Sequence, residues 1–314
     1  MRWTWLKKNI TALYSLATVL IIIFIFQALN PSFLSYEGFR ALIYAMSYFL
    51  IAACGLTFVI LMGSFDFSVV SLLKLAAMFC AVFFDKYGMM VIPISLLLTT
   101  AFGCLNGLLV SLFSIPSFMA TLGVSIVLEG IVLYFSKGKL FLIYDETFRA
   151  LAVKQILGLP AVFFWALMVW AICVFVALYT PFGRKTYAIG ENIVAARLSG
   201  IDVEKHRILV FTLSGFLSGL AGVLYMAQYG GGSVQLGADM SVPLFASIVA
   251  GGTALTGGIG GPHLTLIGVI IITWTQTGLL MLAVGRDVQM IIFGIIAIAL
   301  AAATVDRKRV RIVK

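Results

Sequence analysis

Apolar runs, each close to the length of a membrane-crossing helix, alternate with short polar segments along most of the chain. A helix that spans the hydrocarbon core of a bilayer needs about 20 mainly apolar residues. The pattern predicts helices at residues 13–29, 41–62, 71–84, 91–113, 117–136, 161–180, 208–229, 242–256, 264–283 and 288–305. Two of these ranges, 71–84 and 242–256, are short for a full crossing. We therefore expect an all-α protein with about ten membrane helices, some of them short or broken.

The composition supports a membrane protein. The 314 residues are 62% hydrophobic and 11% charged, whereas soluble domains carry about 45–50% apolar and about 25% charged residues. A water-soluble protein of this length would have too little polar surface to cover itself, so soluble classes of protein are excluded. No polar linker longer than the loop 137–160 divides the chain, and residues 1–314 are expected to form one transmembrane domain.

Basic residues gather near both ends and in one internal loop. They are Arg2, Lys7, Lys8, Arg184, Lys185, Arg197, Lys205, Arg207, Arg307, Lys308, Arg309, Arg311 and Lys314. The formal net charge is +9, but Lys and Arg beside membrane helices mark the cytoplasmic side, which favours an orientation signal over nucleic-acid binding. An even number of spans places both termini and the loop 181–207 on one side. We expect a cytoplasmic N-terminus, a cytoplasmic C-terminus and a cytoplasmic loop at 181–207.

One stretch of that loop, TYAIGENIVAARLSGIDVEKHR (186–207), is short and rich in both charge signs. Asn192 suits the N-cap of a helix, because its side-chain oxygen can accept hydrogen bonds from free backbone N–H groups. Ile193 to Ser199 then favours a short helix, and Gly200 stands where a left-handed glycine ends one. Asp202 can cap the helix that follows. The sequence predicts a short, doubly capped helix between two spans.

The small residues Ala195, Ala196 and Gly200 leave one flank of this helix low enough for another protein to fit closely. The segment 194–200 resembles the Ala-Ala-x-x-x-Gly core of the loop by which ABC importer permeases dock onto their ATPases. The wider sequence GRKTYAIGENIVAARLSGIDV (183–203) is similar to ribose-type carbohydrate importer permeases, in the superfamily that includes branched-chain amino acid permeases. Further matching pieces are LNGLLVSLFSIPSFMATLG (105–123), SGFLSGLAGVLYMAQY (214–229) and IVAGGTALTGGIGG (248–261).

The resemblance implies the ABC importer permease fold and a permease subunit that imports a monosaccharide, such as a ribose- or galactose-like sugar. It also implies a second permease copy or a homologous permease, a cytoplasmic ABC ATPase, an extracytoplasmic solute-binding protein, and a place in a bacterial or archaeal inner membrane. The ATPase-docking residues would be Glu191, Asn192, Ala195, Ala196, Arg197 and Gly200. Without the resemblance, 186–207 would be interpreted as a solvated loop.

Catalytic and nucleotide-binding motifs do not account for this sequence. The phosphate-binding pattern GxxxxGK[ST] has no match, and GGTALTGGIGG (251–261) lacks its lysine. Close helix packing and re-entrant backbone explain these glycines better. His206 and His263 stand apart, and the four cysteines lie in apolar runs without metal-ligand spacing. We expect no enzyme, no metal and no cofactor on this chain, with ATP and Mg²⁺ bound by the partner ATPase.

Charged residues inside a membrane span are costly, so Asp66, Lys74 and Glu129 need an explanation. The family usually reads Gly-Gly-Ile-Asp-Leu-Ser-Val-Gly-Ser around Asp66, and here Asp66 and Ser68 keep their places while the glycines at 64 and 70 are lost. Capping of a half-helix that starts near Ser68 is favoured for Asp66 over substrate contact. Lys74 is expected either to snorkel to an interface or to pair with Asp66. The family usually has arginine where Glu129 stands, so its ion pairing is expected to differ.

Neutral polar side chains suit a sugar pathway. The candidates are Asn106, Gln228, Gln235, Thr253 and Gln276, with Asp66 and Ser68 beside them. Each of these side chains could equally form a helix–helix hydrogen bond. The family often carries glutamate where this chain has Ser241, before Val242 and Pro243, and Asp239 is a substitute cap for the following helix. This departure could alter the solute preference, or mark the diverged half of a heterodimer.

Small residues also recur at helical spacing: Gly215 with Gly219, and Ser218 with Gly222, form small-xxx-small pairs. Such pairs permit close helix contact, and we expect packing within the chain rather than a dimer seam.

Other transport functions stay open at this point. Within the same superfamily, nucleosides, furanose signalling molecules and branched-chain amino acids are alternative solutes. A different class is a secondary transporter driven by an ion gradient, in which Asp66 or Glu129 would be the coupling acid.

Overall fold

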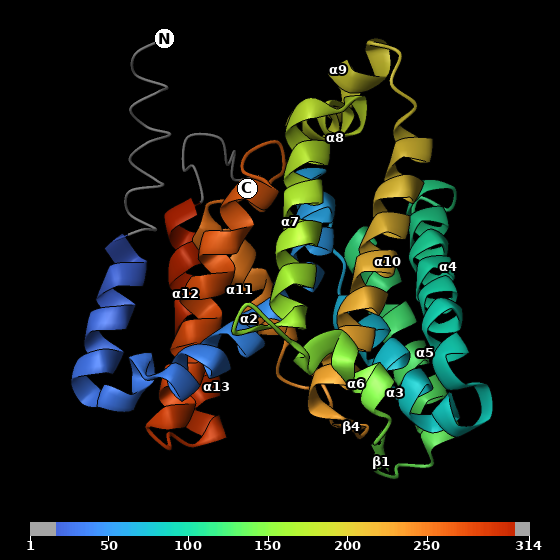
Figure 1. Cartoon of the computed structure of the whole chain (residues 1–314). Helices are drawn as coiled ribbons and strands as arrows, with labels where there is room; N and C mark the ends of the chain where they lie inside the picture. The colour runs from blue at the N-terminus through green and yellow to red at the C-terminus, as the bar shows by residue number, and fades with distance from the viewer. Residues whose placement is uncertain (1–16, 305–314) are drawn as a thin grey trace.

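Helix α2, Tyr36–Leu61, is buried along most of its length and forms the centre of the molecule. Its neighbours include α10, Val203–Tyr229, and α12, Pro262–Met281. The computed structural model describes residues 17–304, with side chains placed as far as residue 296. The helices lie side by side in one bundle (Figure 1).

The remaining helices follow in chain order. They are an apolar helix Ala17–Leu29, the 3-10 turn Pro31–Leu34, α3 (Val69–Tyr87), the 3-10 turn Gly88–Met90, α4 (Val91–Ser111), α5 (Ser117–Ser136), α6 (Glu146–Val153), α7 (Ala161–Tyr179), α8 (Pro181–Glu191), α9 (Ile193–Leu198), α11 (Ser241–Gly251) and α13 (Arg286–Thr304). The strands are short: β1 (Phe141–Leu142) pairs antiparallel with β4 (Gly231–Gly232), and β2 (Gln155–Ile156) pairs antiparallel with β3 (Leu159–Pro160).

Each predicted apolar range overlaps a helix within residues 17–304, although the boundaries differ by up to five residues. Among the residues that the structure describes, six stretches are long and apolar enough to cross a membrane: Tyr36–Leu61, Val69–Ser111, Ser117–Ser136, Ala161–Tyr179, Val203–Tyr229 and Pro262–Met281. The expectation that the helix at 71–84 is too short to cross the membrane is wrong, because α3 has 19 residues. The short span at 242–256 is confirmed as the 11-residue α11. The chain is mostly helical, as expected, while the number of helices that cross the bilayer stays a prediction.

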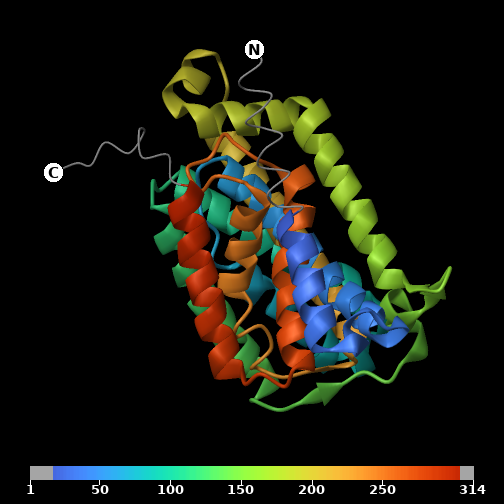
Figure 2. The same cartoon turned by 90° about the vertical axis from the view of Figure 1, so that its left-hand side faces the viewer.

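The two ends of the bundle differ. Figures 1 and 2 place α8 and α9 at one end, and α6 with the paired strands β1 and β4 at the other. The start of the helix Ala17–Leu29 and the end of α13 both point toward the end that carries α8 and α9. The basic residues of the two termini, at positions 2–8 and 307–314, lie outside the described residues, as do the outermost residues of the first and last predicted spans.

Small residues bring α10 into direct contact with its neighbours. A Cβ atom on Gly215 would lie 2.8 Å from the Cα of Gly103 on α4, and one on Gly219 would lie 2.0 Å from Oγ1 of Thr99. A Cβ on Gly222 would lie 2.1 Å from the backbone oxygen of Leu73 on α3. The prediction that these residues pack within the chain is confirmed.

Candidate functional site

Helices α8 and α9 form a bent arm at one end of the bundle, so the loop predicted at 181–207 is largely helical (Figure 2). Thr180 caps α8, because its hydroxyl accepts from the backbone N–H of Gly183 at 3.4 Å. Pro181 occupies the first turn, where a missing N–H costs nothing. The Thr-Pro pair was the available signal for α8, which the sequence interpretation missed.

The predicted caps around α9 are confirmed. The Oδ1 atom of Asn192 accepts from the backbone N–H groups of Val194 and Ala195, each at 3.0 Å. Gly200 follows α9 with a φ of +80°, the left-handed conformation that suits glycine. Asp202 caps α10 by accepting from the backbone N–H of Lys205 at 2.9 Å.

Asn192→Ala is expected to loosen α9 without unfolding the bundle. Loss of an N-cap side chain costs about 0.5–2 kcal/mol, and a six-residue helix has few other bonds of its own. Hydrogen exchange of residues 193–199 is expected to speed up, while exchange in α10 stays unchanged. Asn192→Asp keeps the capping oxygen and is the matched control, so equal acceleration in both variants would contradict the capping argument.

Five of the six predicted docking residues are exposed on this arm: Glu191, Asn192, Ala195, Arg197 and Gly200. The sixth, Ala196, is buried on the inner face of α9, so its side chain is not available to a partner as predicted. Arg197 pairs with Glu204 at the start of α10. A hollow of about 560 Å³ lies between α8 and α9, and its lining residues are Ala188, Glu191, Asn192, Ala195, Ala196, Ser199 and Ile201.

The arm rests on the glycine-rich loop 252–261 and on the end of α2. The backbone N–H of Gly258 donates to the oxygen of Leu61 at 2.8 Å. A Cβ atom on Gly190 would lie 1.9 Å from that same oxygen and 2.6 Å from the nitrogen of Gly258. We call this three-way contact of Gly190, Leu61 and Gly258 the glycine seat. It leaves no space for a side chain at position 190.

Two side chains fix the glycine-rich loop in place. The hydroxyl of Tyr187 on α8 donates to the backbone oxygen of Gly260 at 2.7 Å. Burial raises the pKa of Tyr187, so its phenol remains a protonated donor at neutral pH. The fully buried Thr253, a pathway candidate, accepts from the backbone N–H of Gly261 at 3.0 Å. The structure therefore places Thr253 inside a loop contact.

A second polar cluster surrounds Asp66, which is fully buried. Its Oδ1 atom accepts from the backbone N–H and the hydroxyl of Ser68, at 3.0 and 2.6 Å. Its Oδ2 atom accepts from the hydroxyl of Ser214 on α10 at 2.9 Å, and the amide of Asn106 on α4 donates to the Ser68 hydroxyl at 2.8 Å. Asp66 thus makes structural hydrogen bonds to Ser68 and α10, but no side chain caps α3, so the capping predicted for Asp66 is wrong. Three pathway candidates, Asp66, Ser68 and Asn106, share this buried cluster.

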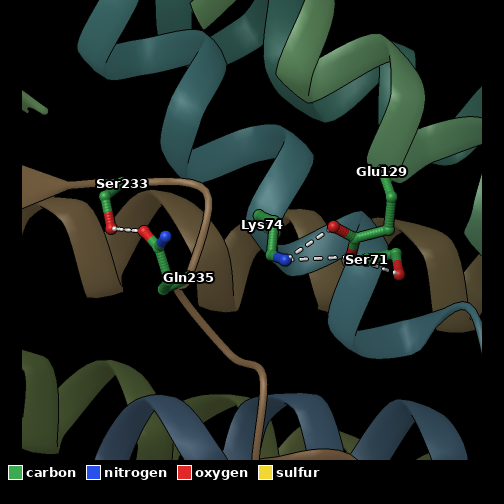
Figure 3. A network of polar contacts seen from close by, with 5 residues as sticks. All are labelled: Ser71, Lys74, Glu129, Ser233 and Gln235. Atoms are coloured by element: carbon green, nitrogen blue, oxygen red, sulfur yellow. Dashed lines mark hydrogen bonds and ion pairs between the residues drawn. The ribbon is translucent and has the colours of Figure 1, made fainter. Parts of the chain in front are cut away.

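The pairing considered between Lys74 and Asp66 is wrong, and Lys74 does not snorkel, because its side chain is buried inside the bundle. Its Nζ atom donates to both carboxylate oxygens of Glu129 on α5, at 2.9 and 2.7 Å (Figure 3). The hydroxyl of Ser71, one turn before Lys74, donates to Glu129 Oε1 at 3.2 Å. The Lys74 side chain is 5% exposed and the Glu129 side chain 45%. The three-residue spacing of Ser71 and Lys74, which places both on one face of α3, was the sequence signal for a shared polar partner.

The remaining pathway candidates lie apart from the Asp66 cluster. Gln228 is buried on α10, and the exposed Gln235 accepts from the hydroxyl of Ser233 at 3.0 Å (Figure 3). Gln276 is half-buried and lines a cavity of about 440 Å³ between α11, α12 and α13. Asp239, the expected substitute cap of α11, instead pairs with Arg286 at the start of α13.

Comparison with known proteins adds to this geometry. Residues 38–301 match the family described as branched-chain amino acid transport system / permease component. The ribose import permease protein RbsC of Haemophilus influenzae is 34% identical over 283 residues, covering 88% of this chain and 88% of that protein. RbsC of Bacillus subtilis is 33% identical over 92% of this chain and 90% of its own length. The L-arabinose transport system permease protein AraH of Escherichia coli is 31% identical over 94% of this chain and 90% of its own length. No solved structure matches the chain.

Proposed function

The chain belongs to the family of branched-chain amino acid transport permease components, as a ribose-type ABC importer permease of the bacterial inner membrane, and we propose that it imports a pentose or a similar monosaccharide. The observation that carries the proposal is the exposed α8–α9 arm, whose hollow is held rigidly on a membrane bundle. The similarity to ribose and arabinose permeases supports the solute class.

The partners follow from the same proposal. A cytoplasmic ABC ATPase, which binds ATP and Mg²⁺, seats an element in the hollow and contacts Glu191, Asn192, Ala195, Arg197 and Gly200. A second copy of this chain, or a homologous permease, completes the pathway, and an extracytoplasmic protein delivers the sugar. Residues 1–314 act as one transmembrane domain with both termini and the arm in the cytoplasm.

The glycine seat explains how the arm would drive the bundle. Gly190 contacts the last residue of α2 and the loop that joins α11 to α12. Because atoms in close contact cannot be compressed, a displacement of α8 moves both of these neighbours with it. ATP-driven closure of two ATPases would in this way shift α2 and α12 between an outward-open and an inward-open arrangement.

The ion-coupled alternative has less support from this geometry. Asp66 is fully buried and accepts hydrogen bonds on both oxygens, from Ser68 and Ser214, and Glu129 is paired with Lys74. The test is an uptake assay in proteoliposomes that contain the permease, the ATPase and the binding protein. D-ribose or L-arabinose is expected to be taken up, whereas a nucleoside and leucine are not. This uptake is expected to require ATP and to continue when an uncoupler is added. Uptake that the uncoupler abolishes would favour the ion-coupled transporter.

Ala195→Trp is expected to prevent co-purification of the ATPase. Ala195 lines the hollow between α8 and α9 and is exposed, so an indole there fills space that a docked partner needs. The measurement is a pull-down of tagged permease from its native membrane, with the ATPase quantified against the permease.

Val194→Trp is the matched control, because Val194 is 64% exposed on the same helix and does not line the hollow. It is expected to retain the ATPase. Retention by both variants, or loss in both, would contradict docking in the hollow.

A further inference from the structure

The ion pair between Lys74 and Glu129 lies deep within two membrane spans. Glu129 is about 18 Å along α5 from Ser117, at 1.5 Å per residue, and Lys74 lies within the first half of α3. Charged side chains at such depth face the interior of a bundle or a water-filled cavity. Lys74 is almost completely buried, but nearly half of the Glu129 side chain is exposed. The carboxylate therefore needs water or a polar solute on its open side.

An irregular segment runs along the same stretch of α3. A Cβ atom on Gly232 would lie 3.0 Å from Sδ of Met78, and one on Gly237 would lie 2.7 Å from Cγ1 of Val70. The segment between these glycines therefore follows α3 past Lys74, and Figure 3 shows Gln235 on the side of Lys74 opposite to Glu129. Non-helical backbone at membrane depth is tolerated only where protein buries it or where it lines a water-filled cavity. Gln235 is exposed, which favours the cavity.

We propose that Glu129 and Gln235 form a polar wall of the translocation pathway and bind hydroxyl groups of the sugar in transit, while the buried Ser71 and Lys74 hold the Glu129 carboxylate in place. This inference rests on the proposed function and adds to it the residues that hold the solute. A sugar hydroxyl both donates and accepts, so it can donate to the carboxylate of Glu129 and accept from the Gln235 amide. The charges of Lys74 and Glu129 cancel. The wall therefore carries no net charge and can bind an uncharged sugar weakly enough to release it.

The first test asks whether the wall meets water. Gln235→Cys leaves the ion pair intact, and it is made in a Cys104→Ala parent, since Cys54, Cys80 and Cys173 are buried. The complete complex in lipid nanodiscs is treated with a permanently charged, membrane-impermeant methanethiosulfonate. The control is Val127→Cys, because Val127 is 55% exposed on α5 but turned about 160° around that helix from Glu129.

The thiol of the Gln235→Cys variant is expected to react many times faster than the thiol of the Val127→Cys variant. Equal or slower reaction of the Gln235→Cys variant would overturn the proposal, because the segment would then face lipid or be sealed by protein. ATP-driven uptake is measured on the same variants reconstituted into proteoliposomes with the ATPase and the binding protein. If the complex takes up sugar but the Gln235→Cys thiol does not react with the methanethiosulfonate, only the polar wall is contradicted. If there is no ATP-driven sugar uptake, the proposed function is contradicted.

The second test asks whether the wall binds sugar. D-ribose or L-arabinose at high concentration is expected to slow labelling of the Gln235→Cys variant, and leucine is expected to leave the rate unchanged. Glu129→Gln preserves the side-chain shape but removes a charge-assisted acceptor, so about tenfold more sugar is expected to be needed for the same protection. Absence of protection by either pentose overturns the proposal. The proposal is also overturned if Glu129→Gln lowers the unfolding temperature but leaves the sugar concentration needed for protection unchanged. That result is expected if the ion pair is purely structural.

Discussion

Replacing Gly190 by alanine is expected to abolish ATP-driven uptake while the bundle still folds into the membrane. The added Cβ atom would lie 1.9 Å from the oxygen of Leu61 and 2.6 Å from the nitrogen of Gly258, and neither backbone atom can rotate away. The contact is relieved only if α8 lifts from the end of α2 and from the loop 252–261. Strain of this kind typically costs about 1–3 kcal/mol, which a large bundle tolerates, but the seat that would transmit ATPase movement is lost.

The measurement compares ATP hydrolysis and sugar uptake in reconstituted complexes. Uptake is expected to disappear, while the ATPase either no longer co-purifies or hydrolyses ATP without transport. Gly123→Ala is the matched control, because an added Cβ on α5 meets nothing within 4 Å and alanine suits a helix interior. Wild-type uptake by Gly190→Ala would show that the arm does not act through the glycine seat.

The positions of the helices could be predicted because membrane helices depend on a local property, the length of an apolar run. The range predicted at 117–136 matches α5 to the residue. Capping is also local, so Asn192 and Gly200 could be assigned correctly around α9. The prediction for α3 was too short, because the Asp-Lys-Tyr end of that helix is polar although it continues the same backbone turn.

The contacts that build the sites could not be predicted in this way. Lys74 and Glu129 are 55 residues apart, and Asp66 and Ser214 are 148 apart, so only the packing of α3 against α5 and α10 brings them together. Asp66 is the nearer charge to Lys74 along the chain, yet the structure pairs Lys74 with another helix. Glycine content alone indicated close packing at 251–261 but did not identify Gly190 and Leu61 as the partners.

Asp66→Ala is expected to cause the largest loss of stability among single changes at the Asp66 cluster. The carboxylate accepts from the Ser68 backbone, the Ser68 hydroxyl and the Ser214 hydroxyl, and all of these groups are buried. Each buried donor left without a partner costs about 1–3 kcal/mol. The sum is on the order of several kcal/mol, a large fraction of the roughly 5–15 kcal/mol that stabilises a typical domain. Thermal unfolding of the purified permease in one detergent measures the difference.

Ser214→Ala separates this structural role from ion coupling. It removes one donor to Asp66 and leaves the two from Ser68, so its loss of stability is expected to be about 1 kcal/mol. If Asp66 holds α3 against α10, unfolding temperatures fall in the order wild type, Ser214→Ala, Asp66→Ala, and sugar uptake falls with the amount of folded permease. If Asp66→Ala instead unfolds at the wild-type temperature and loses uptake completely, the carboxylate acts on a solute or an ion. Because Asp66 is sealed on both oxygens by hydroxyl and backbone donors, the first order is the one that the geometry predicts.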